Sequence, residues 1–147
     1  MEPKDYPFYK WNVFETKHFI LGQDWEIPIP AFFIVEPKRK TMKSILDMSK
    51  EEYADYSEIL LNSRKLMNEA LGIKIVFFYQ EEIGSHFHVW MLPRYEWMEK
   101  FGKSVESVRL VMEYAKEKMM TDKDISKVKE ALVKAQKYAV SKKWLIK

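Results

Sequence analysis

Residues 85–92, with the sequence SHFHVWML, hold two of the chain's three histidines. Their aromatic and apolar composition predicts a β-strand, in which alternating side chains place His86, His88 and Trp90 on one face. Successive side chains on that face stand roughly 6.5–7 Å apart, so one imidazole can contact a phosphate while its neighbour orients the same group. The opposite face is apolar and is expected to pack in the core: Phe87, Val89 and Met91.

The residues that flank this strand add groups suited to an anionic ligand. Gly84 and Ser85 can bring a backbone N–H and a hydroxyl close to an anion. Arg94, directly after Pro93, is expected either to meet a phosphate or to lie exposed at the surface. The pattern therefore favours phosphate chemistry on one face of a strand.

The elements that must position these residues can be read from periodicity. A helix is expected at 49–71, with Ser49 as N-cap, Glu52 completing a capping box and Gly72 ending it. Strands are expected at 12–14, 18–21, 31–35, 73–78 and 85–92, and a polar turn at 80–84. Apolar residues at helical spacing predict two more helices, at 104–119 and 124–141, whose stripes face each other or the sheet. This order indicates an α+β domain built on an antiparallel sheet, with a C-terminal helical hairpin.

The composition of the chain excludes several classes of protein and several kinds of site. A chain of 147 residues that is 47% hydrophobic can form one compact domain with a sizeable core. The net charge of +3 suits an anionic ligand, but the lysines are scattered among glutamates, so no dedicated nucleic-acid surface is expected. The absence of cysteine excludes disulfides and a thiol nucleophile. No signal peptide or membrane span is evident, and we expect a cytoplasmic protein.

Residues 86–94, HFHVWMLPR, resemble the strand of the histidine triad family, His-φ-His-φ-His-φ-φ, which is often followed by Pro-Arg. Upstream, residues 32–39 (FFIVEPKR) are similar to the family's strand and Pro-Lys-Lys/Arg turn, and a long helix follows. The resemblance covers about residues 12–95. It implies a triad-like domain at 1–100, with residues 101–147 as a helical extension packed on it.

The resemblance implies a nucleotidyl hydrolase or transferase acting on a dinucleoside polyphosphate, nucleotide ester or phosphoramidate. The middle histidine of the motif, here His88, would carry the nucleotidyl group, and His86 and Ser85 would support it. Asp24 matches the family's ribose-binding carboxylate, and Trp90 would line the phosphate pocket. The family also implies a homodimer. No metal-ligand set is evident in the sequence, so we expect no required cofactor, with Mg²⁺ at most accompanying the substrate.

The chain departs from the family pattern at three places. Trp90 replaces the third histidine, although its indole N–H can still donate to a phosphate. Phe32 stands where many members have a fourth histidine, and residues 80–85 form a shorter loop than the family's Asn-x-Gly…Gly-Gln segment.

These departures keep other interpretations open. The chain could be a nucleotide-binding module with little turnover, or His86 and His88 could be packing or surface residues. A metal-dependent hydrolase would need a third ligand, for which His18, Glu81 and Glu82 are candidates. For Asp24, capping of a turn is an alternative to ribose binding.

Overall fold

The computed structural model describes residues 2–84 and 86–144, and for His86 it describes the backbone alone. Within these residues the strands form one antiparallel sheet, and their bounds are β1 (Asn12–Glu15), β2 (Phe19–Gln23), β3 (Phe33–Pro37), β4 (Val76–Ile83) and β5 (His86–Pro93). The helices are α1 (Lys50–Glu69), α2 (Val108–Lys118) and α3 (Asp122–Ser141), with short 3₁₀ turns at Pro3–Asp5, Ile45–Asp47, Glu96–Phe101 and Val105–Ser107. This is the α+β architecture that the sequence predicts.

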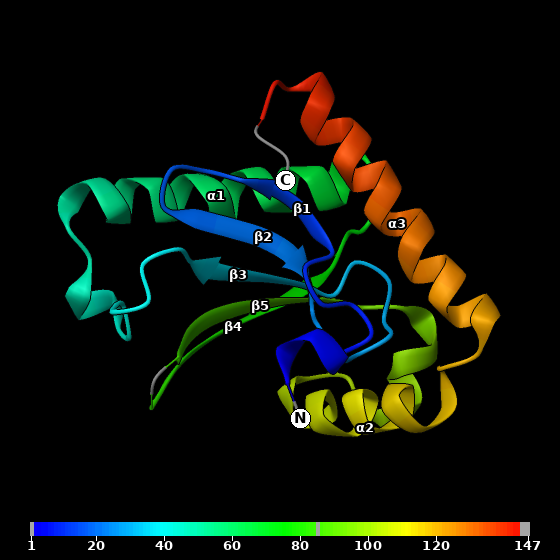
Figure 1. Cartoon of the computed structure of the whole chain (residues 1–147). Helices are drawn as coiled ribbons and strands as arrows, with labels where there is room; N and C mark the ends of the chain where they lie inside the picture. The colour runs from blue at the N-terminus through cyan, green and yellow to red at the C-terminus, as the bar shows by residue number, and fades with distance from the viewer. Residues whose placement is uncertain (1, 85, 145–147) are drawn as a thin grey trace.

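The strand order is β1-β2-β3-β5-β4, so the histidine strand β5 lies between β3 and β4 (Figure 1). Ile34 of β3 pairs with Trp90, and Val35 pairs with Val89. On the other side, Tyr79 of β4 pairs with Trp90. Directly paired residues point to the same face of a sheet. Side chains of β5 are therefore flanked on both sides by those of neighbouring strands.

Helix α1 begins and ends where the sequence predicts. Ser49 Oγ accepts a hydrogen bond from the Glu52 backbone N–H, and Glu52 accepts from the Ser49 N–H in return, which is the expected capping box. Gly72 lies just past the helix with φ +67°, a conformation that glycine adopts without strain. Helical spacing in the sequence predicts that Tyr53 lies on the buried face of α1, but Tyr53 is 53% exposed, whereas Ile59 is fully buried.

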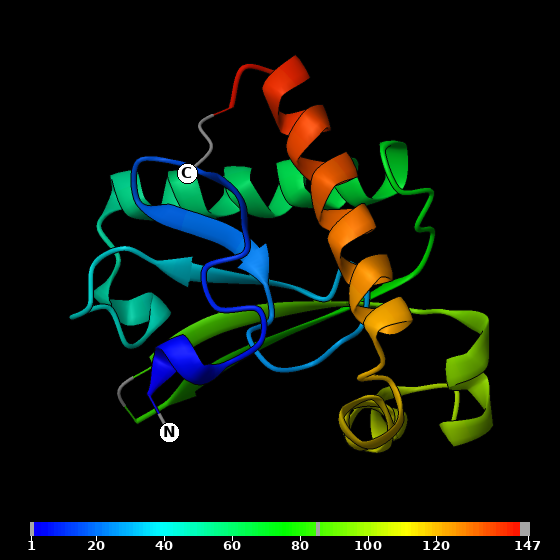
Figure 2. The same cartoon turned by 45° about the vertical axis from the view of Figure 1, so that its right-hand side comes forward.

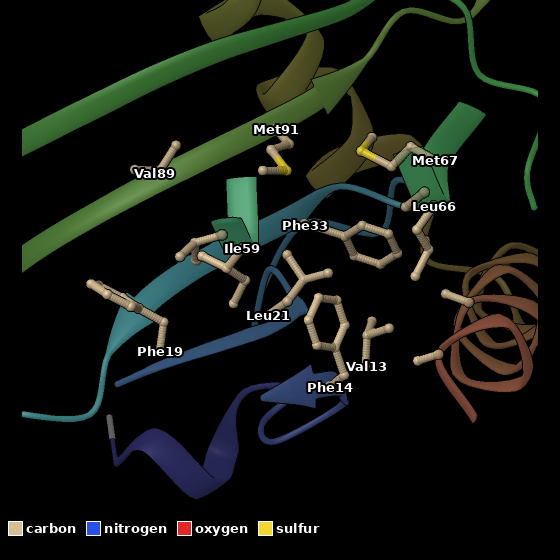
Figure 3. Packing of buried hydrophobic residues seen from close by; sticks show 14 of the residues in the cluster. Val13, Phe14, Phe19, Leu21, Phe33, Ile59, Leu66, Met67, Val89 and Met91 are labelled. Carbon is tan, nitrogen blue, oxygen red and sulfur yellow. The ribbon is translucent and has the colours of Figure 1, made fainter. Parts of the chain in front are cut away.

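The main core lies between α1 and one face of the sheet (Figure 3). Phe87, Val89 and Met91 of β5 are buried in it, which confirms the predicted alternation along the histidine strand. Figure 3 shows Met91 and Phe33 of the sheet beside Leu66 and Met67 of the helix. The face of β5 that carries His88 and Trp90 therefore points away from α1.

The opposite face of the sheet is only partly covered. A second apolar cluster on that side joins the segment after β2, the end of β5 and helix α2, through residues that include Ile29, Phe32, Leu92, Val111 and Ala115. Trp90 and Tyr79 pack at its margin. This second cluster fixes α2 beside the face that displays the histidine strand (Figure 2).

The two predicted C-terminal helices are present but take different sides of the molecule. Helix α3 packs on β1 and α1, with Leu132, Ala135 and Ala139 in the main core. Helix α2 belongs to the second cluster through Val111 and Ala115. Helical spacing in the sequence predicts that Val108 and Met112 are buried, but they are only half-buried. Of the two predicted arrangements, the stripes face the sheet and its surroundings, because a sheet has two apolar faces to cover.

Strand β4 is shifted from the predicted range 73–78, because it begins at Val76 and continues to Ile83. Residues 80–83, expected in a polar turn, continue the strand and pair with β5 down to Ile83 opposite His86. Of the residues predicted to form this turn, Gly84 alone follows the strand, and its φ is +59°. The polar residues remain in the strand because they find partners: Gln80 accepts from the Tyr56 hydroxyl at 2.5 Å, and Glu82 accepts from the Ile45 N–H at 2.7 Å.

None of the helices in the described part of the chain is both long enough and apolar enough to cross a membrane.

Candidate functional site

A cavity of about 680 Å³ opens over β3 and β5, on the face of the sheet that α1 does not cover. His88 and Trp90 line it from β5, and Ile34 and Glu36 line it from β3. Cavities of this size hold drug-sized ligands and cofactors in other proteins. The sheet register brings the histidine strand directly to the cavity wall.

His88 lies on this wall, half-buried. Its ring meets the indole of Trp90 edge-on, with 5.2 Å between ring centroids. Glu81 of β4 is its direct partner across the strand pair, and Glu36 of β3 lies on the same cavity wall. His88 is therefore an imidazole between two carboxylate-bearing strands and open to a ligand.

Trp90 is held in one orientation by its neighbours. Its indole N–H donates to Asp24 Oδ2 at 3.0 Å, and its rings stack on Tyr79 with centroids 5.3 Å apart and planes 13° from parallel. Burial raises the pKa of the Tyr79 hydroxyl, so that ring stays neutral. The sequence suggested that the Trp90 N–H could donate to a phosphate; in the structure this donor is occupied by Asp24.

Asp24 has a structural role that the sequence left as an alternative. Its Oδ1 accepts hydrogen bonds from the backbone N–H groups of Glu26 and Ile27, each at 2.9 Å, and so caps the turn after β2. The same side chain lines the cavity, where it is largely buried. Asp24 thus joins the turn, Trp90 and the cavity wall.

The remaining predicted site residues lie elsewhere or outside the described residues. Ser85 and the His86 side chain are not described, and His86 is placed only by its backbone pairing with Ile83. Gly84 is exposed at the tip of the β4–β5 hairpin and does not line the cavity.

Arg94 does not line the cavity either. It is half-buried and donates to Ser107 Oγ and to the Gly102 carbonyl oxygen, each at 2.9 Å, with its guanidinium 4.6 Å from the ring centroid of Phe77. Neither of the two expectations for Arg94 describes this arrangement, because its charge ties the end of β5 to the segment before α2.

Several cavity residues were not recognised in the sequence. Tyr6, Trp25 and Met112 line one end, and Lys40 and Lys43 line the other. The basic turn after Pro37 could have indicated the lysines. No local pattern marks the first group, because the three residues come from distant segments.

Ion pairs fix the charges around the cavity. Glu26 meets Lys116 of α2 at 2.8 Å, and this hydrogen bond raises the pKa of the lysine. Arg39 pairs with Glu52 at 2.8 Å, and its hydrogen bonds lower the pKa of that carboxyl to about 2. Both pairs join a cavity segment to a helix, which holds the walls in place.

The candidate metal ligands do not assemble within the described residues. No group of three or more histidine, aspartate or glutamate side chains there could hold a metal ion. His18 lies in the β1–β2 connection, 3.5 Å from Glu51 of α1, and Glu82 bonds to Ser44. Neither residue lines the cavity that His88 lines.

No protein-family model and no curated protein matches this sequence. Among solved structures, it is similar to a zinc-bound histidine triad family protein from Mycobacterium smegmatis, at 13% identity and a TM-score of 0.59 over 94% of this chain and 91% of that one. It is also similar to a hypothetical histidine triad nucleotide-binding protein from Sulfolobus tokodaii, at 16% identity and a TM-score of 0.51 over 81% and 85% of the two chains.

The C. elegans NitFhit protein is a further match, at 16% identity and a TM-score of 0.56 over 84% of this chain. This chain spans about a quarter, 26%, of that longer protein. At these identities the likeness concerns the fold. The protein therefore has the fold of the histidine triad proteins, as the resemblance in residues 12–95 implied.

Proposed function

We propose that this protein binds a nucleotide in the cavity over β3 and β5 and transfers its nucleotidyl group through His88. The observation that carries the proposal is the position of His88, on the interior strand β5 of a sheet with the triad fold and on the wall of a ligand-sized cavity. A structural neighbour whose name includes nucleotide binding supports the ligand class.

The proposed reaction has two displacements at phosphorus. A ring nitrogen of His88 attacks the α-phosphorus; a P–N bond forms, and the P–O or P–N bond to the leaving group breaks, with its electron pair going to the leaving group. Water or another acceptor then attacks the same phosphorus, and the bond to His88 breaks. Positioning and charge stabilisation supply most of the acceleration, and His86 would support His88. No metal or other cofactor is required in this scheme, although a nucleotide can bring Mg²⁺ with it.

Substitution of His88 tests the proposal. His88→Asn should abolish turnover of diadenosine tetraphosphate and adenosine phosphoramidate, a loss of several orders of magnitude, while nucleotide binding remains measurable. Intact-protein mass spectrometry of the wild type after rapid acid quench should show an adenylyl adduct that the variant lacks. Full turnover by His88→Asn would overturn the assignment.

A second candidate function is nucleotide binding with little turnover. The observation in its favour is the Trp90–Asp24 hydrogen bond, which occupies the donor that replaces the third imidazole. The same experiment separates the two functions, because nucleotide binding by a wild-type protein that shows neither turnover nor an adduct would favour the binding module.

We also propose that the protein is a homodimer formed along β4, in the soluble cytoplasmic setting expected from the sequence. β4 is an edge strand of the sheet, and an unpaired edge can pair with a second copy. Large apolar side chains are exposed on β4 and α1 and in the segment between them, namely Tyr53, Leu61, Ile75, Phe78 and Ile83. Burial of such residues in an interface would remove them from water.

A further inference from the structure

The two ends of the cavity differ in character. β3 begins at Phe33, next to the turn that holds Trp25, and runs toward Pro37 and the basic segment after it. β5 runs antiparallel beside it, so the cavity passes from Trp90 to His88 in the same direction. An aromatic end thus lies beyond Trp90, and a cationic end lies beyond His88.

The cationic end is formed by residues 38–43, which are held by contacts with α1, with Asp47 and with the main core. Arg39 pairs with Glu52 of α1 and donates to the Asp47 carbonyl oxygen at 2.8 Å. The Asp47 carboxylate accepts from the Lys43 backbone N–H at 2.8 Å, and Met42 is buried in the main core. The loop is thus ordered without using the ammonium groups of Lys40 and Lys43.

Lys40 and Lys43 are the cations at this end whose charge is not matched by a carboxylate. Both are exposed and line the cavity, and within the described residues neither ammonium forms an ion pair or a side-chain hydrogen bond. By contrast, the acidic Glu26 near the aromatic end is paired with Lys116. The cavity lysines without an ion pair in the described part of the chain therefore lie on the far side of His88.

We propose that Lys40 and Lys43 bind the phosphates beyond the one that His88 attacks, so that the preferred leaving group is a pyrophosphate or longer polyphosphate. This inference rests on the proposed function. When the bridging P–O bond breaks, its electron pair goes to the departing oxygen, and two ammonium groups beside that chain stabilise the developing charge. A neutral amine leaving group would gain nothing from them.

Binding of ATP and AMP to the full chain tests the assignment without requiring turnover. Wild type should bind ATP more tightly than AMP. Lys40→Ala and Lys43→Ala should each weaken ATP binding on the order of 5-fold, and the double variant on the order of 20-fold, with AMP affinity unchanged. Lys137→Ala, which removes an exposed lysine of α3, is the matched control and should alter neither affinity.

The outcomes separate this inference from the proposed function. An unchanged ATP-to-AMP affinity ratio in the double variant, or an equal loss for both nucleotides, would overturn the lysine site while leaving the nucleotide cavity intact. Binding of neither nucleotide by wild type would overturn the proposed function and the inference with it. In turnover, the double variant should lose kcat/KM for diadenosine tetraphosphate by the same order as it loses ATP affinity, but keep kcat/KM for adenosine phosphoramidate. An equal loss of kcat/KM on both substrates would contradict a role in leaving-group recognition.

Discussion

The indole at position 90 limits which groups this face of the strand can bind. The Trp90 N–H is directed to a carboxylate from a segment 66 residues away, and one ring face lies on Tyr79. Unlike an imidazole, an indole has no acceptor nitrogen and does not titrate. Trp90 is therefore a fixed wall beside His88 rather than a second acid–base group.

A double-mutant cycle measures the coupling between Trp90 and Asp24. In Asp24→Asn the amide can still accept from the turn, but its NH₂ group would face the indole N–H. We expect this change to lower the free energy of unfolding by about 1–2 kcal/mol. In a Trp90→Phe background the same change should cost clearly less, as measured by chemical denaturation. Equal costs in both backgrounds would show that the hydrogen bond contributes nothing.

Glu52 predicts a particular loss of stability in acid. Its pKa is lowered to about 2 by Arg39, compared with an ordinary value of 4.5, so its contribution is complete above about pH 5 and is lost as the pH falls toward 2. The pair is partly solvent-screened, since the Arg39 side chain is 41% exposed, and we expect on the order of 1–2 kcal/mol.

Denaturation of wild type and Glu52→Gln between pH 6 and 2.5 checks this expectation. The substituted glutamine would keep the capping box but would not titrate, so the stability difference between the two proteins should shrink as the pH falls. Glu58→Gln, an exposed change on the same helix, is the control and should leave the pH profile unaltered. A constant difference across the range would contradict the assignment to Glu52.

At the residue scale, the sequence predicted the face to which a side chain points better than it predicted the residues that the side chain contacts. Period-2 alternation correctly separated Phe87, Val89 and Met91 from His88 and Trp90, because the pleat of a strand is a local property. The hydrogen bond from Trp90 to Asp24 and the tether of Arg94 to Ser107 join residues that no local pattern connects. Such contacts follow from the tertiary fold.

Helices and strands were predictable where residues at their ends mark the boundary, as capping residues do for a helix. Ser49 and Glu52 mark the start of α1, and Gly72 marks its end, since caps satisfy backbone groups locally. β4 was shortened in the prediction because its second half is polar. Its pairing with β5 depends on partners such as Tyr56 and Ser44, which sequence periodicity does not reveal.

Helix α3 provides a test of whether residues 101–147 fold as part of the domain. Leu132 is 2% exposed and packs in the same core as α1 and the sheet. We expect Leu132→Ala to lower the free energy of unfolding by about 2–4 kcal/mol in one cooperative transition. Val140→Ala removes a side chain that is 62% exposed on the same helix and should cost much less. A separate early transition that involves α3 alone would indicate an independently unfolding extension.

At the scale of the whole molecule, the two faces of the sheet differ, because one packs against the main core and the other carries the cavity. One face is covered by α1 and α3, and the other is covered only in part by α2 and the segment after β2. The cavity lies where this second cover ends, over β3 and β5. The antiparallel sheet and the histidine strand were predicted from the sequence. The extent to which the second face is covered was not, because it depends on where α2 docks.

The proposed dimer predicts how the assembly responds to charge at the β4 edge. Phe78→Lys should shift the protein from dimer to monomer in sedimentation or light scattering, because burial of the lysine in the interface would remove the water that solvates its charge, at a cost in free energy. Phe78 and Leu110 are each 43% exposed, so Leu110→Lys on α2 is a matched control and should leave the dimer intact. A wild-type monomer at micromolar concentration would contradict the proposal.

The cavity walls come from segments that are far apart in the sequence, and this has a mechanical consequence. Tyr6 comes from the start of the described chain, Lys43 and His88 from its middle, and Met112 from α2 near the other end of the sequence. A molecule bound among them would act as a non-covalent cross-link between segments that lie far apart in the sequence. A fusion or a cleavage near Tyr6 would then change ligand affinity although the histidine strand is unaltered. A tag at that end of the chain would therefore appear as a defect in ligand binding.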